Sequence, residues 1–191
     1  MNIIELLSPS GTKEINITES NSENIVKITD IFNISDENSL ESTENKKFDL
    51  VINLDKNCNN SNITVIARYE TVQKQKKYFT ISVFLHGKNQ TAKIDLRGVS
   101  DDSSLLTFNG GGILTENSEK SKIEIIQRIH LFSEKSKAKA IPILRVETDD
   151  VLSASHSASV APFSNELYFF METRGITRKD AKELMKKGLL L

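Results

Sequence analysis

The chain has 191 residues, 38% of them hydrophobic, which is enough for one domain with a sizeable buried core. Its 25 basic and 26 acidic residues leave a formal net charge of -1, so charge alone draws it neither to nucleic acid nor to an anionic membrane. No apolar run reaches the roughly 18 residues of a membrane helix, and the start of the chain lacks the features of a signal peptide. The sequence therefore predicts a soluble, cytoplasmic protein with no nucleic-acid or membrane partner.

Residues 1–47 form a polar and weakly patterned segment. It contains two apolar pieces, Ile25 to Ile28 and Ile31 to Ile34, which we interpret as short strands and as candidates for the first coils of a β core. The stretch from Ser35 to Lys47 is rich in Ser, Asn and Glu. Because it can bury too little apolar area to offset the entropy of ordering it, we expect a flexible connection there.

From Phe48 onward, apolar and polar residues alternate with the period of two that is typical of half-buried strands. The runs with this pattern are Phe48 to Leu54, Ile63 to Tyr69, Tyr78 to Leu85, Ala92 to Leu96, Leu105 to Phe108, Ile123 to Phe132 and Ile141 to Val146. The alternation of the sixth run is imperfect, which predicts a bend or bulge near Ile126. Residues 48–160 are therefore predicted to form an all-β core.

Periodicity alone leaves two all-β architectures open, an antiparallel sandwich and a parallel β-solenoid. Among the expected turns, only Asn109-Gly110 offers the dipeptide that tight antiparallel hairpins favour. This scarcity of hairpin signals mildly favours the solenoid. In either architecture, Gly110 to Gly112 indicates a tight turn without side chains or a close backbone approach.

Cys58 is the single cysteine of the chain, which excludes an internal disulfide and a CxxC metal site. It lies in the polar segment Asp55 to Asn62, between two strand-like runs. We therefore predict an exposed loop thiol, and nothing nearby except Lys56 would lower its pKa.

Residues 161–191 switch to helical periodicity. In Glu166 to Arg174 the apolar side chains Leu167, Phe170 and Met171 fall on one face, and Gly175 is a typical helix stop. Ser164 or Asn165 is the expected N-cap. Two short helices cannot form a core of their own, so this segment must dock on the β domain or on a partner.

A second helix is predicted directly after the first one. Thr177 to Asp180 is similar to a capping box, Ala181, Leu184 and Met185 form an apolar stripe, and Gly188 is expected to end the helix. The lysines at positions 179, 182, 186 and 187 are most simply interpreted as a solvated helix face.

A motif extends over the end of the chain, where a strand from Ile141 is followed by a Ser-His-Ser turn around His156 and by the two helices. The pattern resembles the C-terminal signature of the SufB/SufD family of iron-sulfur cluster assembly proteins. The matching positions are Pro142, Leu144, Asp150, Val151, Ser155, His156, Ala158, Leu167, Phe169 or Phe170, Arg174, Gly175, Ile176, Ala181, Leu184 and Gly188. A weaker similarity extends upstream through residues 95–99 and 127–131.

The resemblance implies a right-handed parallel β-helix followed by a small helical domain. It also implies partners: a SufC-type ABC ATPase that binds the C-terminal helices, and a SufB-like subunit that pairs with this chain. A homodimer is the alternative to that pair. The residues implied in ATPase docking are Leu167, Phe170, Met171, Arg174, Gly175 and Leu184.

His156 matches the family's functional histidine at the subunit interface, where a transient iron-sulfur cluster is assembled. A neutral imidazole is a competent iron ligand. The SufB branch typically carries a cysteine upstream and a glutamate directly after this histidine, whereas this chain has no cysteine after Cys58 and has Ser157 at the glutamate position. The chain thus looks SufD-like, and we expect no cluster to be held tightly by this chain alone. His86 and His130 lack such a context and are interpreted as ordinary strand residues.

Two functional hypotheses follow. The first is a non-enzymatic, SufD-like scaffold subunit. The alternative is a metal-free β-solenoid module that only recruits an ATPase or another partner. An enzyme is less favoured, because Gly110 to Gly112 lacks the Lys-Ser/Thr of a phosphate-binding loop and no catalytic triad is indicated.

Overall fold

The computed structural model describes residues 1–31 and 45–191, which form a two-sheet solenoid followed by two helices. The strands are β1 (Asn2–Leu7), β2 (Gly11–Ile17), β3 (Glu23–Asp30), β4 (Asn45–Leu54), β5 (Asn62–Thr71), β6 (Lys76–Leu85), β7 (Thr91–Ser100), β8 (Leu105–Leu114), β9 (Ser121–Leu131), β10 (Lys137–Val146) and β11 (Val151–Pro162). The helices are α1 (Asn165–Glu172) and α2 (Arg178–Leu190).

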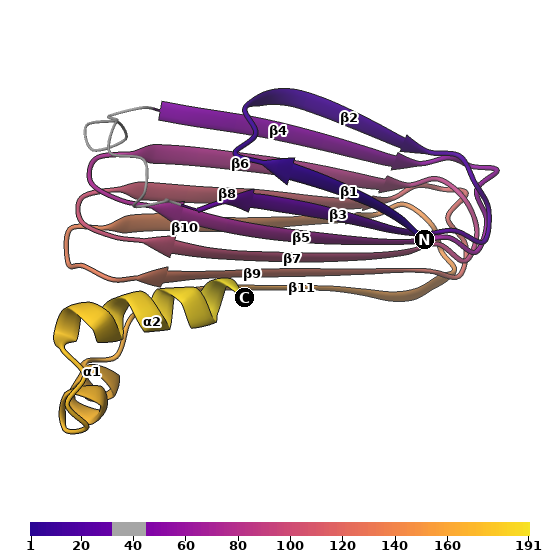
Figure 1. Ribbon diagram of the computed structural model, residues 1–191. Coiled ribbons are helices and arrows are strands. Elements are labelled where there is room, and N and C mark those ends of the chain that lie inside the picture. The colour runs from indigo at the N-terminus through magenta and orange to yellow at the C-terminus, as the bar shows by residue number, and fades with distance from the viewer. Residues whose placement is uncertain (32–44) are drawn as a thin grey trace.

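Strands alternate between the two sheets along the chain. Odd-numbered strands form one sheet in the order β1-β3-β5-β7-β9-β11, and even-numbered strands form the other in the order β10-β8-β6-β4-β2. Every pairing in both sheets is parallel. Figure 1 shows the two sheets facing each other along the length of the molecule. The parallel β-solenoid is therefore confirmed, and the antiparallel sandwich that periodicity left open is wrong.

Each rung of the solenoid consists of one strand from each sheet. The rungs repeat about every 30 residues, so that Asn62 pairs with Thr91 and Thr91 pairs with Lys122. The turns at one end also stack. Asn60 donates its N–H to the carbonyl of Lys88, and Asn89 donates to the carbonyl of Glu119. Both asparagines have positive φ angles near 55°, a conformation that Asn tolerates better than most residues.

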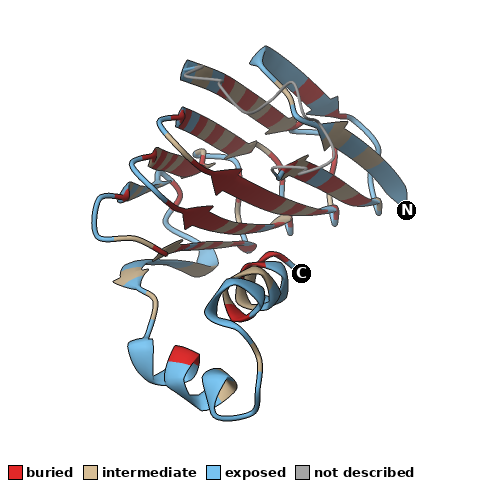
Figure 2. Ribbon diagram, turned by 60° about the vertical axis from the view of Figure 1, so that its left-hand side comes forward, coloured by how far each residue is buried: buried red, intermediate tan, exposed pale blue. Residues whose placement is uncertain are grey.

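The core lies between the sheets and is filled by alternate residues of each strand, as the striped burial in Figure 2 shows. Phe79 is fully buried at its centre and contacts three other rings. Its ring centroid lies 5.7 Å from that of Phe48, 5.1 Å from that of Tyr69 and 6.3 Å from that of Phe108. These aromatic side chains come from both sheets and therefore hold the sheets together.

The N-terminal segment belongs to the solenoid. Its strands β1 to β3 contribute Ile15, Ile17, Val26 and Ile28 to the core, so the predicted first coils are present. Most of the predicted strand at Ile31 to Ile34, and most of the predicted flexible connection, lies outside the described residues. The last three residues of the predicted connection, 45–47, form a strand, because β4 begins at Asn45.

The predicted bulge near Ile126 is wrong, since β9 pairs with β7 in an unbroken register from Lys122 to Leu131. The imperfect alternation has another cause: Ile126 lies on the outer face, while the polar Gln127 is fully buried inside. The register shift of this sheet lies in β11 instead, between Val151 and Ser153.

Gly110 and Gly112 lie within β8 and not in a turn, and the prediction of a close approach is the correct alternative. A Cβ atom on Gly110 would come within 2.3 Å of Gln127 Nε2, and one on Gly112 would come within 2.3 Å of Ile123 Cδ1. The interior side chains of β9 therefore occupy the space that side chains at these positions would need. Glycine is required here for packing, because neither position has the positive φ that would otherwise explain it.

The prediction of an exposed Cys58 is wrong, because its side chain is fully buried. The turn folds back through a hydrogen bond from the Cys58 N–H to the carbonyl of Asp55. The thiol donates a hydrogen bond to the carbonyl oxygen of Glu19, which lies 2.8 Å away in the preceding rung. Cys58 is thus part of the stacked turns, where it is inaccessible to partners.

No helix in the described ranges is long and apolar enough to cross a membrane.

Candidate functional site

The strand that carries the motif, β11, forms one edge of the six-stranded sheet. It pairs with β9 on one side, and no described strand pairs with its other side. It has 12 residues, VLSASHSASVAP, none of them Asp, Glu, Lys or Arg. Natural proteins usually protect edge strands with charges, proline or bulges. β11 has its only interior irregularity near its start and its only proline at its end, so most of its edge is open to pairing.

His156 lies within β11, so the predicted Ser-His-Ser turn is wrong. His156 is in register with Ile125, which is in register with Ile94, and both isoleucines are fully buried in the core. The imidazole therefore occupies an inward position of the last rung. It is nevertheless exposed, because no further described rung covers it.

Ser157 is in register with Ile126 and lies on the outer face of the sheet. Successive side chains of a strand point to opposite faces, so His156 and Ser157 cannot bind one ion together from a regular strand. The inward neighbours of His156 on β11 are Ala154 and Ala158, which offer no metal ligand. Nor do the described residues include a group of three or more His, Cys, Asp or Glu side chains able to hold a metal ion.

The second sheet ends in β10, whose edge differs from that of β11. β10 carries Pro142 at its centre, along with the cations Lys137, Lys139 and Arg145. Proline has no N–H to donate to an added strand, and charged side chains disfavour edge-to-edge pairing. Of the two edges at this end of the solenoid, only β11 is suited to accept another strand.

Helix α1 begins at the predicted cap, with Ser164 Oγ accepting from the N–H of Glu166 at 3.2 Å. Its buried residue is Tyr168, which the predicted stripe did not include. Leu167 and Phe170 are 49% and 51% exposed, and Phe169, which the stripe also omitted, is 68% exposed. The apolar side chains of α1 thus face two directions, and most of them point into solvent. Figure 2 shows the helix as mostly exposed.

Two other predicted docking residues lie at the end of α1. The guanidinium of Arg174 lies over the ring of Phe170, 4.1 Å from its centroid, which is a cation–π contact. Gly175 has a φ of +81°, so it adopts the left-handed conformation of a helix stop. Met171 is partly buried and packs against a small second core, whose buried members are Val99, Phe132, Tyr168, Ala181 and Leu190.

Helix α2 begins at the predicted cap Thr177, whose Oγ1 accepts from the N–H of Asp180 at 3.2 Å. Gly188 does not end the helix, which continues to Leu190 because that leucine is buried against the solenoid. Ala181 is fully buried, whereas Leu184 is 53% exposed. The stripe predicted for α2 is therefore divided between the solenoid and solvent.

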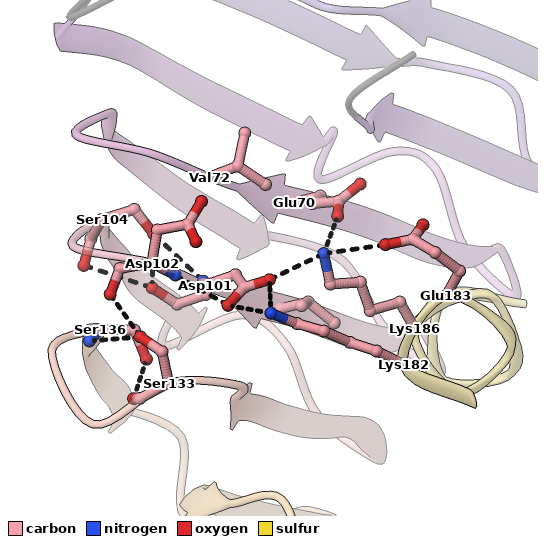
Figure 3. A network of polar contacts seen from close by, with 12 residues as sticks. Glu70, Val72, Asp101, Asp102, Ser104, Ser133, Ser136, Lys182, Glu183 and Lys186 are labelled. Carbon is pink, nitrogen blue, oxygen red and sulfur yellow. Dashed lines mark hydrogen bonds and ion pairs between the residues drawn. The ribbon is translucent and has the colours of Figure 1, made fainter. Parts of the chain in front are cut away.

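The lysines of α2 are not a uniformly solvated face, so that interpretation is wrong. Lys186 is only 6% exposed and lies 3.1 Å from Glu70 Oε1 and 2.9 Å from Asp101 Oδ2. Lys182 Nζ lies 2.6 Å from the same Asp101 oxygen. Figure 3 shows both lysines reaching from α2 to carboxylates at the ends of two adjacent strands of the first sheet. We refer to Glu70, Asp101, Lys182 and Lys186 as the latch.

The latch continues into the next turn of the solenoid. Ser133, in the turn between β9 and β10, donates from Oγ to the carbonyl of Asp102, next to the latch. Burial alone would raise the pKa of Asp101, but hydrogen bonds from Lys182 and Lys186 outweigh it, and the pKa lies below its ordinary value. Burial would lower the pKa of Lys186, yet Asp101 and Glu70 raise it. Asp101 and Lys186 are therefore charged near neutral pH, and their ion pair helps to fix α2 to the solenoid.

Comparison with known protein families finds a match that covers most of the chain. Residues 42–189 match the model described as "SUF system FeS cluster assembly, SufBD core domain". The matched range contains β4 to β11 and nearly all of α1 and α2, which together we call the tail.

Curated relatives carry related names. The chain is similar to the iron-sulfur cluster assembly protein SufD of Bacillus subtilis, with 33% identity over 117 residues that cover 61% of this chain and 26% of that protein. It is 33% identical over 52 residues to a SufBD family protein of Mycobacterium leprae, covering 27% of this chain and 13% of the relative. Over 89 residues it is 27% identical to SufD of Plasmodium falciparum, covering 47% of this chain and 6% of the relative. The matched part is thus a small fraction of each relative.

Proposed function

The chain belongs to the SufBD core-domain family of the SUF system, and on that basis we propose that it is a SufD-like, non-enzymatic scaffold subunit for iron-sulfur cluster assembly in the cytoplasm. In this proposal it pairs through β11 with a SufB-like subunit or with a second copy, and it binds a SufC-type ABC ATPase through its helical tail. The observation that carries the proposal is the family match, which spans both the open edge strand and the latched tail.

The exposed apolar side chains of the tail support the docking part of the proposal. Leu167, Phe169, Phe170 and Leu184 are each about half exposed or more. Large aromatic and aliphatic side chains in such positions are common anchors of protein interfaces. The latch holds α2 on the solenoid, so a partner bound there would meet a preorganised surface and lose less entropy on binding.

The geometry of β11 supports the pairing part of the proposal. An added strand would find an uncharged edge of 12 residues, and main-chain hydrogen bonds along such an edge are a recurring mode of recognition. His156 lies in the middle of that strand, at the open end of the solenoid. Pairing through β11 would therefore bring His156 close to side chains of the partner subunit.

The iron-sulfur cluster is cargo in this proposal. His156 would supply one ligand, and the remaining donors would come from the partner, since thiolates dominate iron-sulfur sites and the only cysteine of this chain is buried in a distant turn. Ser157, which lies on the outer face, would contact the partner subunit and not the iron. The alternative, a metal-free module that only recruits a partner, assigns no role in cluster formation to His156.

Replacing His156 with alanine distinguishes the two hypotheses. We expect cluster formation to fall about tenfold or more, as is usual when metal coordination is disturbed. The measurement is the visible absorbance of clusters formed by the chain reconstituted with a SufB-like subunit, a SufC-type ATPase, iron and sulfide. His86→Ala is the matched control, because His86 follows β6 in another rung and stacks on Phe84. Unchanged cluster formation by H156A, with ATPase binding intact, would favour the metal-free module.

A further inference from the structure

Three arginines are aligned in one column across the outer face of the six-stranded sheet. Arg68 of β5 is in register with Arg97 of β7, and Arg97 is in register with Arg128 of β9. Neighbouring strands lie about 4.8 Å apart, so the three cationic side chains arise from adjacent positions. Like charges directly opposite each other destabilise a sheet. The column therefore needs compensating negative charge.

The residues that the structure describes supply only part of that compensation. Asp95, in the neighbouring column, lies 2.9 Å from Arg68 Nη2 and 3.3 Å from Arg97 Nε. Arg68 is buried and also donates to the carbonyls of Ala67 and Asp95. Arg128 is exposed, and no described residue accepts a hydrogen bond from it or forms an ion pair with it. Within the described ranges, two guanidinium groups thus share one carboxylate, while the third has none.

The surroundings of Arg128 do not neutralise it. Glu124, two columns away, lies 3.9 Å from Lys93, and Glu70, in the flanking column on the other side, is engaged by Lys186 of the latch. The pKa of His130, two residues from Arg128 on the same strand, is lowered by burial and also by the charge of Arg128. On the edge strand, Ser159 continues the arginine column. The outer face near β9 and β11 therefore combines an unpaired cation with a hydroxyl group.

We propose that Arg97, Arg128 and Ser159 form a docking surface for acidic side chains of a partner protein that lies across β7, β9 and β11. A protein fits better than a free anion, because the outer face of a sheet cannot enclose a small ion and exclude water from it. It also fits better than nucleic acid, which is held by many cations along its backbone, whereas Asp95 and Glu124 interrupt the positive charge here. The proposal concerns the chemistry of the partner and does not depend on the SUF assignment.

An NMR titration of the full chain with an oligoglutamate peptide tests the proposal. We expect the side-chain Nε–Hε signals of Arg97 and Arg128 to shift. Arg128→Gln should weaken binding about threefold to fivefold, the range for an exposed ion pair. Arg145→Gln is the matched control, because Arg145 lies on β10 of the other sheet and is 70% exposed. Both substitutions are at exposed positions, so the fold should be retained, as the remaining amide signals would report.

Several outcomes would overturn the docking surface. One is the absence of shifts at Arg97 and Arg128, and another is an equal loss of affinity in the two variants. A single-stranded DNA oligonucleotide that binds more tightly than the peptide would also contradict it, as would inorganic phosphate that alone reproduces the shifts. None of these results depends on ATPase binding by the tail, so the SUF proposal is tested separately.

Discussion

Replacing Phe79 with alanine is expected to lower the free energy of unfolding by about 3–5 kcal/mol, the usual range for truncating a buried phenylalanine. Phe79 is fully buried, and its ring contacts Phe48, Tyr69 and Phe108 from both sheets. Truncation removes these contacts and leaves a cavity at the centre of the solenoid. The parallel pairing of β4, β6 and β8 limits how far the neighbouring strands can move to fill it. The measurement is chemical denaturation of the purified chain.

Phe84→Ala is the matched control for this prediction. Phe84 lies on the same strand but faces outward, is only partly buried and stacks on His86. Because outward side chains bury less area, this variant should lose much less stability than Phe79→Ala. Equal losses in the two variants would show that the core does not lie between the two sheets as described.

Replacing Lys186 with methionine is expected to cost about 3 kcal/mol, the lower end of the range for breaking a buried ion pair, because Asp101 keeps its contact with Lys182. Lys186 is the cation that Glu70 and Asp101 share, and methionine has a similar length but no charge. Hydrogen exchange should then increase in α2 more than in the strands, because the latch is the main polar link of the helix to the solenoid. Lys187→Met, at the exposed neighbouring position, should change stability by about 0.5 kcal/mol or less.

The latch also predicts a dependence on pH. The folded-state pKa of Asp101 lies below its ordinary value, so Asp101 stabilises the fold above the unfolded pKa of about 3.9, and this contribution is lost as pH falls through the folded pKa. Lys186→Met should raise the folded pKa of Asp101 and so make stability less dependent on pH in the acid range. Identical acid unfolding curves for the variant and the parent would contradict the assigned role of Lys186.

Strands and helix caps could be predicted from the sequence because they depend on local chemistry. Each of the seven predicted runs lies within or overlaps a strand, and Ser164 and Thr177 cap the two helices. The parallel stacking of strands depends on contacts between residues about 30 positions apart, and its signals in the sequence are weaker. One such signal is the spacing of Asn60, Asn89 and Lys120, which all adopt positive φ angles in successive turns. The chemical difference between asparagine and lysine hides this repeat from a search for identical residues.

Burial of polar and titratable groups was the least predictable part. Lys186 belongs to a lysine-rich helix that is normally solvated, and only the carboxylates of Glu70 and Asp101, far away in sequence, explain its burial. Cys58 lies in a polar segment, yet it is enclosed because Glu19 of the preceding rung stacks on its turn. Tyr168 is buried, whereas Leu167 and Phe170 of the predicted stripe are about half exposed, because α1 packs against the small second core and not against a broad face. Each of these positions depends on contacts between distant rungs or elements.

The proposed candidate site combines one feature that the motif indicated with others that required the structure. The motif drew attention to His156 and to the tail residues Leu167, Phe170 and Leu184. The structure added the open edge of β11, the latch and the aligned arginines of the outer face. The edge and the aligned arginines arise from pairing between strands about 30 positions apart, which a single sequence does not reveal. The latch joins a helix to strand ends that are 81 or more positions away.

Co-purification with a SufC-type ABC ATPase tests the central claim most directly. The full chain, co-expressed with such an ATPase, is predicted to form a complex that persists through size-exclusion chromatography. Phe170→Asp should abolish the complex because it places a charge among exposed apolar anchors, while Ile143→Asp, at an equally exposed apolar position on β10, should leave it intact. Failure of the unmodified chain to bind any SufC-type ATPase, or equal binding by both variants, would contradict the claim that the tail is the docking surface.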